Sequence, residues 1–172
     1  MQLYRVPKSN SGFTLIEIVI TSIVVGVLAA ISVPNLFGLF TQNTVKADIS
    51  KIESALKEAQ RQAIRKSKQC TVSIDYSSSP IAISSNPPDC ILSKREIDET
   101  LVMKSEPNDS TLDITFSYKG NVQNSYTIVL YSDFASTRKC VYVSDGLGII
   151  KQGSYLGDVS GTIDPNQCQP SN

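Results

Sequence analysis

The sequence has no histidine and no tryptophan among its 172 residues. Histidine is the commonest general base and a frequent metal ligand, so its absence excludes Ser-His-Asp and Cys-His catalysis. The remaining side chains form no recognisable metal-binding cluster and place no nucleophile beside a plausible base. The sequence therefore predicts a protein that is not an enzyme and that has neither a cofactor nor a metal site.

An excess of either charge is also missing, because Lys+Arg and Asp+Glu both number 16. Nucleic-acid-binding domains usually carry a clear excess of basic residues on one face. Residues 152–172 contain no Lys or Arg at all. The charge balance therefore argues against a general nucleic-acid binder.

Charge is lacking altogether from residues 18–45, which are dominated by Ile, Val, Leu, Ala and Phe. A helix of about 20 apolar residues spans the roughly 30 Å hydrocarbon core of a bilayer. Residues 13–35 are therefore predicted to form a membrane-spanning helix. Its one acid, Glu17, costs on the order of 2.5–3.5 kcal/mol in that setting, which makes it a candidate functional residue.

The segment Ser11–Glu17 (Ser-Gly-Phe-Thr-Leu-Ile-Glu) and the apolar run behind it resemble the processing site of type IV prepilins and type II secretion pseudopilins. The resemblance implies that residues 1–12 are a leader. A prepilin peptidase would cut between Gly12 and Phe13 and methylate the new N-terminal Phe13. Glu17 would then meet the N-terminal amine of a neighbouring subunit and set the axial stagger during filament assembly. An ordinary signal anchor that happens to contain one acid is the alternative.

Two residues of the apolar run, Gly26 and Pro34, weaken a helix, and proline removes a backbone hydrogen bond. In the resembled family such positions mark a segment that bends or melts when subunits assemble; a plain kink is the alternative. Arg5 and Lys8 precede the run, so the positive-inside rule places the N-terminus in the cytoplasm. The sequence thus predicts a single-pass membrane protein with its head outside. The resemblance to prepilins implies that the membrane is the inner one and that the protein later joins a pilus or periplasmic filament of like subunits.

None of the four cysteines forms a C-x-x-C pair, and all lie beyond the apolar run. An even number of widely spaced cysteines in an exported domain predicts two disulfides, for which three connectivities exist. The favoured pairs each close a loop rich in Ser, Pro or Gly: Cys70–Cys90 and Cys140–Cys168. Free buried cysteines are the alternative.

Apolar residues recur at helical spacing over residues 41–68, which predicts an amphipathic helix behind a membrane and assembly helix at residues 13–40. Glu53–Lys57 and Glu58–Gln62 both have i,i+4 spacing, and the first is a favourable ion pair; the basic residues near position 65 suit the helix C-terminus. The apolar stripe comprises Val45, Ile49, Ile52, Leu56, Ala59 and Ala63, and the charged face includes Lys46, Asp48, Lys51, Glu53, Lys57, Glu58, Arg61 and Arg65.

From residue 70 the period changes to two, which predicts antiparallel strands. The clear strands are 72–76, 112–118, 126–131, 138–143 and 149–151; Ile91–Leu92 and Leu101–Met103 are weaker candidates. Residues 77–89 are predicted to be a loop with at most a short strand, and residues 106–109, 119–121 and 146–148 to be turns. Because strand 149–151 follows Gly146-x-Gly148, that pair fits a hairpin better than a phosphate loop. The tail, residues 157–172, is expected to be held only by Cys168.

The predicted fold is α+β and pilin-like, with a long N-terminal helix packed on a small antiparallel β-rich head at residues 69–172. The order Phe116–Gly120, Tyr126–Tyr131 and Cys140–Gly148 is similar to the GspH/FimT group of minor pilins and pseudopilins. This implies a structural subunit of a type IV pilus or type II secretion filament. A C-terminal disulfide tilts the choice toward the pilus, because pseudopilins often carry calcium sites or salt bridges there.

The alternative function is that of a DNA receptor, because some FimT-like minor pilins bind DNA through basic residues near the final strand and tail. The candidates here are Arg138, Lys139 and Lys151. Phosphate contacts drive such binding, so these few cations predict weak binding.

Overall fold

The computed structural model describes residues 12–107 and 111–170, without the side chains of residues 31–37. The chain divides into two compact units, residues 1–37 and residues 38–172, called here the N-terminal unit and the head unit. The long helix α1 (Leu15–Lys66) contributes to both. Leader residues 1–11 and part of the turn predicted at residues 106–109 lie outside the described residues.

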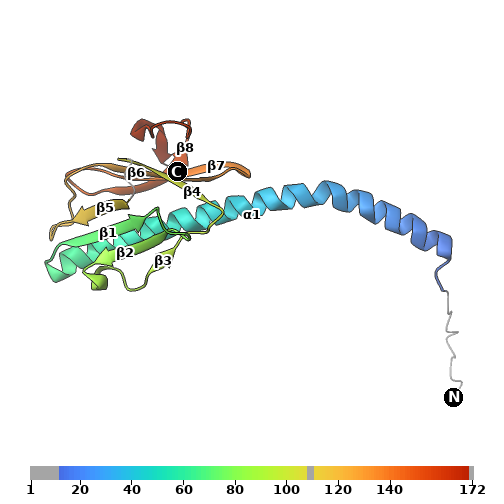
Figure 1. Ribbon diagram of the computed structural model, residues 1–172, viewed down its shortest axis with the longest axis horizontal. Helices are drawn as coiled ribbons and strands as arrows, with labels where there is room; N and C mark the ends of the chain where they lie inside the picture. The colour runs from blue at the N-terminus through green and yellow to red at the C-terminus, as the bar shows by residue number, and fades with distance from the viewer. Residues whose placement is uncertain (1–11, 108–110, 171–172) are drawn as a thin grey trace, which may run out of the picture. The chain divides into compact units, whose positions relative to one another are not determined.

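The head unit combines the second half of α1 with two antiparallel sheets (Figure 1). The first sheet has the order β3-β2-β1-β5 and the second has the order β4-β6-β7-β8-β9. The strands of the first sheet are β1 (Cys70–Asp75), β2 (Ala82–Asn86), β3 (Arg95–Glu96) and β5 (Thr111–Phe116). Those of the second are β4 (Val102–Glu106), β6 (Tyr126–Ser132), β7 (Ala135–Val143), β8 (Ile150–Tyr155) and β9 (Cys168–Pro170). Two short 3-10 helices, η1 (Pro88–Cys90) and η2 (Pro165–Gln167), complete the described elements. The α+β expectation is confirmed.

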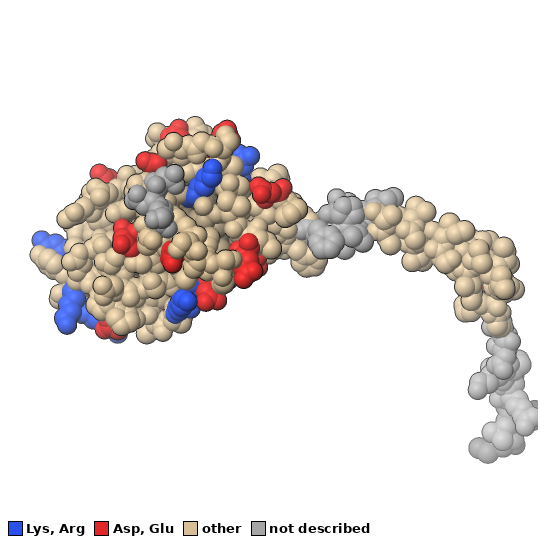
Figure 2. All heavy atoms as spheres, in the orientation of Figure 1, with Lys and Arg blue, Asp and Glu red and all other residues tan. Residues whose placement is uncertain are grey.

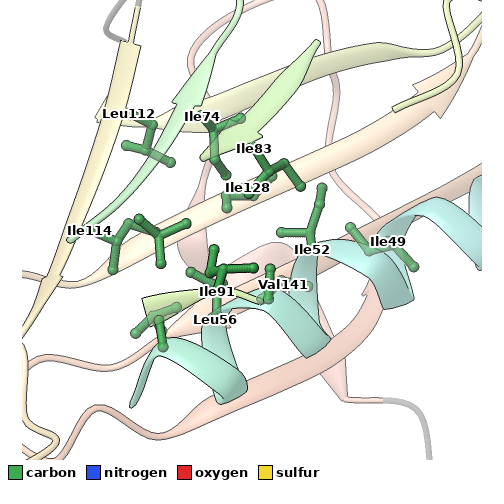
Figure 3. Packing of buried hydrophobic residues seen from close by; sticks show 14 of the residues in the cluster. Ile49, Ile52, Leu56, Ile74, Ile83, Ile91, Leu112, Ile114, Ile128 and Val141 are labelled. Atoms are coloured by element: carbon green, nitrogen blue, oxygen red, sulfur yellow. The ribbon is translucent and has the colours of Figure 1, made fainter. Parts of the chain in front are cut away.

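The predicted apolar stripe of α1 is the helical side of the core. All six of its residues, from Val45 to Ala63, are fully buried in one cluster with residues of both sheets. Figure 3 shows Ile52 and Leu56 projecting from the helix toward residues such as Ile128 of β6. Burying a large aliphatic side chain contributes about 1.5–3 kcal/mol, so this stripe fixes the helix to the head.

One expectation about the charged face of α1 is wrong. Asp48 is only 2% exposed, because its carboxylate accepts the backbone N–H of Asp98 at 2.7 Å and pairs with Lys51 at 2.6 Å. Glu58, also on that face, has its Oε2 2.6 Å from the guanidinium of Arg95. Both acids contact the segment that contains β3, which the helix periodicity alone does not reveal.

Several strand predictions also need correction. Ile91–Leu92 is not a strand: it follows η1, and the N–H of Ile91 is donated to the Ser85 hydroxyl. The short strand expected within residues 77–89 exists as β2, which pairs with β1 from Asn86 to Ala82. The weak candidate strand Leu101–Met103 corresponds to β4, which starts at Val102 and continues to Glu106.

The tail is held by more than its disulfide, contrary to the expectation. Strand β9 pairs with β8, and Ile163 is 3% exposed in a second small cluster on the far side of β6 and β7. The Arg138 guanidinium donates to the carbonyl of Gly157 at 2.7 Å. The tail therefore packs over the second sheet as a part of the head unit.

Both disulfides have the pairing that the sequence favoured. Cys70–Cys90 ties the start of β1 to η1, and Cys140–Cys168 ties β7 to β9. Among the described residues no cysteine is free.

Candidate processing and assembly site

The predicted cleavage junction lies directly before the first turn of α1. Gly12, Phe13 and Thr14 have no regular secondary structure, and Phe13 is 78% exposed. Nothing lies within 4 Å of the position that a Cβ on Gly12 would take. An exposed, non-helical peptide bond is the form in which a backbone is accessible to a peptidase.

The motif also encodes the start of the helix. The Thr14 hydroxyl accepts the backbone N–H of Glu17 at 3.3 Å, and the Thr14 carbonyl accepts that N–H and the N–H of Ile18. Thr at the N-cap with Glu three residues later has the spacing of a capping box. Glu17 lies in the first turn, where a carboxylate is favoured by the helix dipole. Thr14 and Glu17 therefore place the helix start two residues after the junction.

Most described side chains of the N-terminal unit are apolar, and all of them are exposed. The Thr21 and Ser22 hydroxyls donate to backbone carbonyls of the preceding turn. Among the described side chains of this unit, Glu17 is therefore the one polar group that would need a partner from another molecule. On the face shown in Figure 2, the charged side chains gather on the head unit. The exposed large apolar residues are Phe13, Leu15, Ile16, Ile18, Val19, Ile20, Ile23, Val24, Val25, Val27 and Leu28. Such a continuous apolar surface marks an interaction site.

In the described part of the chain, no helix has both the length and the hydropathy of a membrane span. Residues 13–35 as a transmembrane helix stay a prediction. Gly26 lies within α1 with no atom within 4 Å of its Cβ position. Position 34 is also helical, but the side chain of Pro34 lies outside the described residues, so the predicted flexibility is untested.

Two of the three cations of the DNA-binding alternative are hydrogen-bonded within the head. Arg138 is bonded to the Gly157 carbonyl, and the Lys139 ammonium donates to the Ser154 hydroxyl at 2.8 Å. Lys151 is exposed on β8, opposite Tyr142. Two of the three charges are thus already engaged by oxygen atoms of the head.

The glycine pair at positions 146 and 148 forms a hairpin turn, as predicted. Both have positive φ, at 68° and 63°, and β8 begins two residues later. No helix N-terminus follows the turn, which a phosphate loop requires. Within the described residues, no group of three or more Cys, Asp or Glu side chains could hold a metal ion.

Comparisons with known proteins give one family match and two structural matches. Residues 7–33 match the family model described as the prokaryotic N-terminal methylation motif. The fold is similar to that of the type IV minor pilin FimU of Pseudomonas aeruginosa in two crystal forms. One has a TM-score of 0.51 at 14% identity and covers 63% of this chain and 87% of the other. The second has a TM-score of 0.50 at 14% identity and covers 62% and 90%. No curated protein matches the sequence.

These likenesses agree with the sequence-based resemblance to type IV pilins. The match at residues 7–33 includes both sides of the Gly12–Phe13 junction and Glu17. Over 63% of the chain the fold is similar to that of a pilin, at 14% sequence identity. Nothing in these comparisons distinguishes the GspH/FimT group from other minor pilins.

Proposed function

We propose that this chain is a structural subunit of a type IV pilus or related filament, made as a precursor and cut between Gly12 and Phe13. The observation that carries the proposal is the exposed junction directly before a capped helix whose apolar side chains are all exposed over residues 15–30. The methylation motif supports the cleavage site, and the likeness to a minor pilin supports the structural role.

The apolar surface requires two successive environments under this proposal. Before assembly, the lipid of the inner membrane covers it, with residues 1–12 in the cytoplasm and the head outside. After cleavage, the helices of neighbouring subunits cover it in a filament. Burial of such area in either environment is favourable by about 25 cal/mol per Å², so the helix can exchange one cover for the other.

Glu17 is the polar group that would give this packing its register. Cleavage creates an amine at Phe13, and a carboxylate removed from water needs a cationic partner. By the resemblance to type IV pilins, the partner amine would come from the next subunit. The pairing sets the axial offset between subunits.

A subunit of the pilus is favoured over one of the secretion filament by the C-terminal bridge, Cys140–Cys168, and by the likeness to a minor pilin. Assignment to the GspH/FimT group is the narrower part of the proposal and depends on the residue pattern from Phe116 to Gly148. The DNA-receptor alternative is not favoured, because Arg138 and Lys139 are engaged within the head.

The first test is mass spectrometry of the protein extracted from membranes of cells that express a prepilin peptidase. We expect a mature N-terminus at Phe13 carrying one methyl group. An unprocessed terminus at Met1 in those cells would overturn the proposal.

The second test is incorporation of Glu17→Gln protein into filaments sheared from the cells. Glutamine keeps the size and removes the charge, so processing at Phe13 should persist while incorporation falls at least tenfold. The matched control is Thr21→Val, one turn further along, which should assemble normally. Equal incorporation of the Glu17 variant would remove the assembly role from this residue.

A further inference from the structure

A polar hollow of about 480 Å³ lies in the head unit where the chain passes from β5 to β6. Its volume is in the range of small-molecule sites in proteins. The side chains that decide its chemistry are Gln69, Tyr118, Lys119, Gln123, Asn124 and Tyr126. None of them belongs to the proposed assembly site, so the hollow is open to a separate role.

The wall of the hollow is fixed by the backbone of residues 117–122. The N–H of Ser117 is donated to the carbonyl of Asn121 at 2.9 Å, and the N–H of Gly120 to the carbonyl of Ser117 at 2.8 Å. From α1, the Gln60 side-chain amide donates to the Gly120 carbonyl at 2.8 Å. The next residue inward, Val122, is 4% exposed in the core. The backbone of this wall is therefore held in place before a ligand binds.

Several carboxamide side chains line the hollow. Within the described residues, the side chains of Gln69, Gln123 and Asn124 make no hydrogen bond to another residue, and all three are exposed. Each carboxamide offers two N–H donors and one carbonyl acceptor in a plane. Paired donors and acceptors match the neighbouring hydroxyl groups of a polyol, each of which both donates and accepts.

Two tyrosines supply the apolar part of the lining. Tyr118 is 56% exposed, with the Lys119 ammonium 5.5 Å from its ring centroid. Tyr126 is half-buried, and its ring packs against the core. An aromatic ring with a polar edge presents a flat apolar face beside a hydrogen-bonding group, which suits a ligand with C–H faces and hydroxyl edges.

The charged residues that line the hollow further restrict the class of ligand that it can bind. No carboxylate lines the hollow, which disfavours a cation, and Lys119 is its one basic residue. A phosphate or nucleic-acid site draws its affinity from several cations. We propose that this hollow binds a neutral saccharide, with Gln69, Gln123 and Asn124 bonded to its hydroxyl groups and a tyrosine ring against its C–H face.

The test uses the full-length protein in a zwitterionic detergent without a sugar headgroup, because a glycoside detergent would compete. The probe is a glycan array that displays neutral and sialylated oligosaccharides, together with a control series of immobilised extended peptides. We expect binding to one or more neutral glycans. Binding confined to sialylated glycans or to peptides, or no binding at all, would overturn the proposal.

Variants then locate the bound glycan. Gln123→Ala combined with Asn124→Ala should weaken binding of the array hit at least tenfold, whereas Gln169→Ala, an exposed amide on β9 outside the hollow, should not change it. Tyr118→Ala should weaken binding, and Tyr118→Phe should keep it because the ring remains. Equal binding by the double variant and the Gln169 control would show that the glycan binds elsewhere. The assay needs no filament, so its result is independent of the proposed assembly function.

Discussion

Asp48 and Glu53 form similar ion pairs on α1 that differ in burial, and so in their expected contribution to stability. Each carboxylate lies 2.6 Å from a lysine about one turn along α1, at Lys51 and Lys57 respectively. The side chain of Glu53 is 18% exposed, whereas that of Asp48 is 2% exposed and also accepts the N–H of Asp98. Exposed pairs contribute little, but a buried carboxylate that also accepts a backbone N–H contributes more.

We therefore expect Asp48→Ala to lower the free energy of unfolding by about 1–3 kcal/mol, because the Asp98 N–H is left without its acceptor. Glu53→Ala is the matched control and should cost about 0.3–0.5 kcal/mol, the value of an exposed i,i+4 pair. The measurement is guanidinium unfolding of the purified full chain followed by circular dichroism. Equal losses in the two variants would contradict the role assigned to Asp48.

Residue patterns along α1 could not have predicted this role. The helical period separates the apolar stripe from everything else, so Asp48 falls on the charged face by default. Its partner comes from a segment 50 residues later in the chain. That segment has local hydrogen bonds of its own. The pKa of Asp98 is lowered mainly by the hydrogen bond from the Thr100 hydroxyl, and further by the hydrogen bond from the Thr100 backbone N–H. Contacts of this kind depend on the tertiary fold, which periodicity does not contain.

At the scale of elements, the hairpin turn between β7 and β8 depends on two glycines with different surroundings. Gly146 and Gly148 both have positive φ, in which a side chain costs about 1–2 kcal/mol. A Cβ on Gly146 would meet nothing within 4 Å. A Cβ on Gly148 would lie 2.4 Å from the Gly120 carbonyl oxygen and 3.0 Å from Nε2 of Gln60. This Nε2 donates to the carbonyls of Gly120 and Gly148.

Gly146→Ala should therefore cost only the conformational strain of about 1–2 kcal/mol. Gly148→Ala should cost at least about 1–3 kcal/mol more, because the two turns must separate and the bonds of Gln60 are lost. Thermal unfolding of the two variants side by side is the measurement. If both lose the same stability, the close approach of the Gly120 and Gly148 turns is not needed by the fold.

Helices and strands with a clear apolar pattern in their own residues could be predicted. Those defined mainly by pairing with another strand could not. The stripe from Val45 to Ala63 and the alternation in β5 and β6 identify their buried faces directly. Strand β9 has three residues and little apolar pattern, so only its pairing with β8 defines it. At the candidate site, the motif around Gly12 was readable from the sequence, whereas the exposure of the junction required the structure.

At the scale of the whole molecule, the tail and the second sheet form a small core of their own. Val129, Cys140, Tyr155 and Ile163 are buried together, apart from the main cluster beneath α1. The Tyr155 hydroxyl accepts the N–H of Asp164 at 3.0 Å, which fixes the tail just before η2. The tail thus has apolar and hydrogen-bonded attachments that do not depend on the Cys140–Cys168 bridge.

We expect the double variant Cys140→Ser with Cys168→Ser to lose stability but to keep its tail in place. A bridge that closes a loop of this length contributes about 3–4 kcal/mol, mainly by restricting the unfolded chain. The native attachments around Ile163 remain, so limited proteolysis of the double variant should leave residues 157–170 uncut. Adding Ile163→Asp places a charge in the small core and should open that segment to cleavage, whereas Thr162→Asp, at the exposed neighbour, should not. Cleavage of the tail in the double variant would mean that the disulfide is its main attachment.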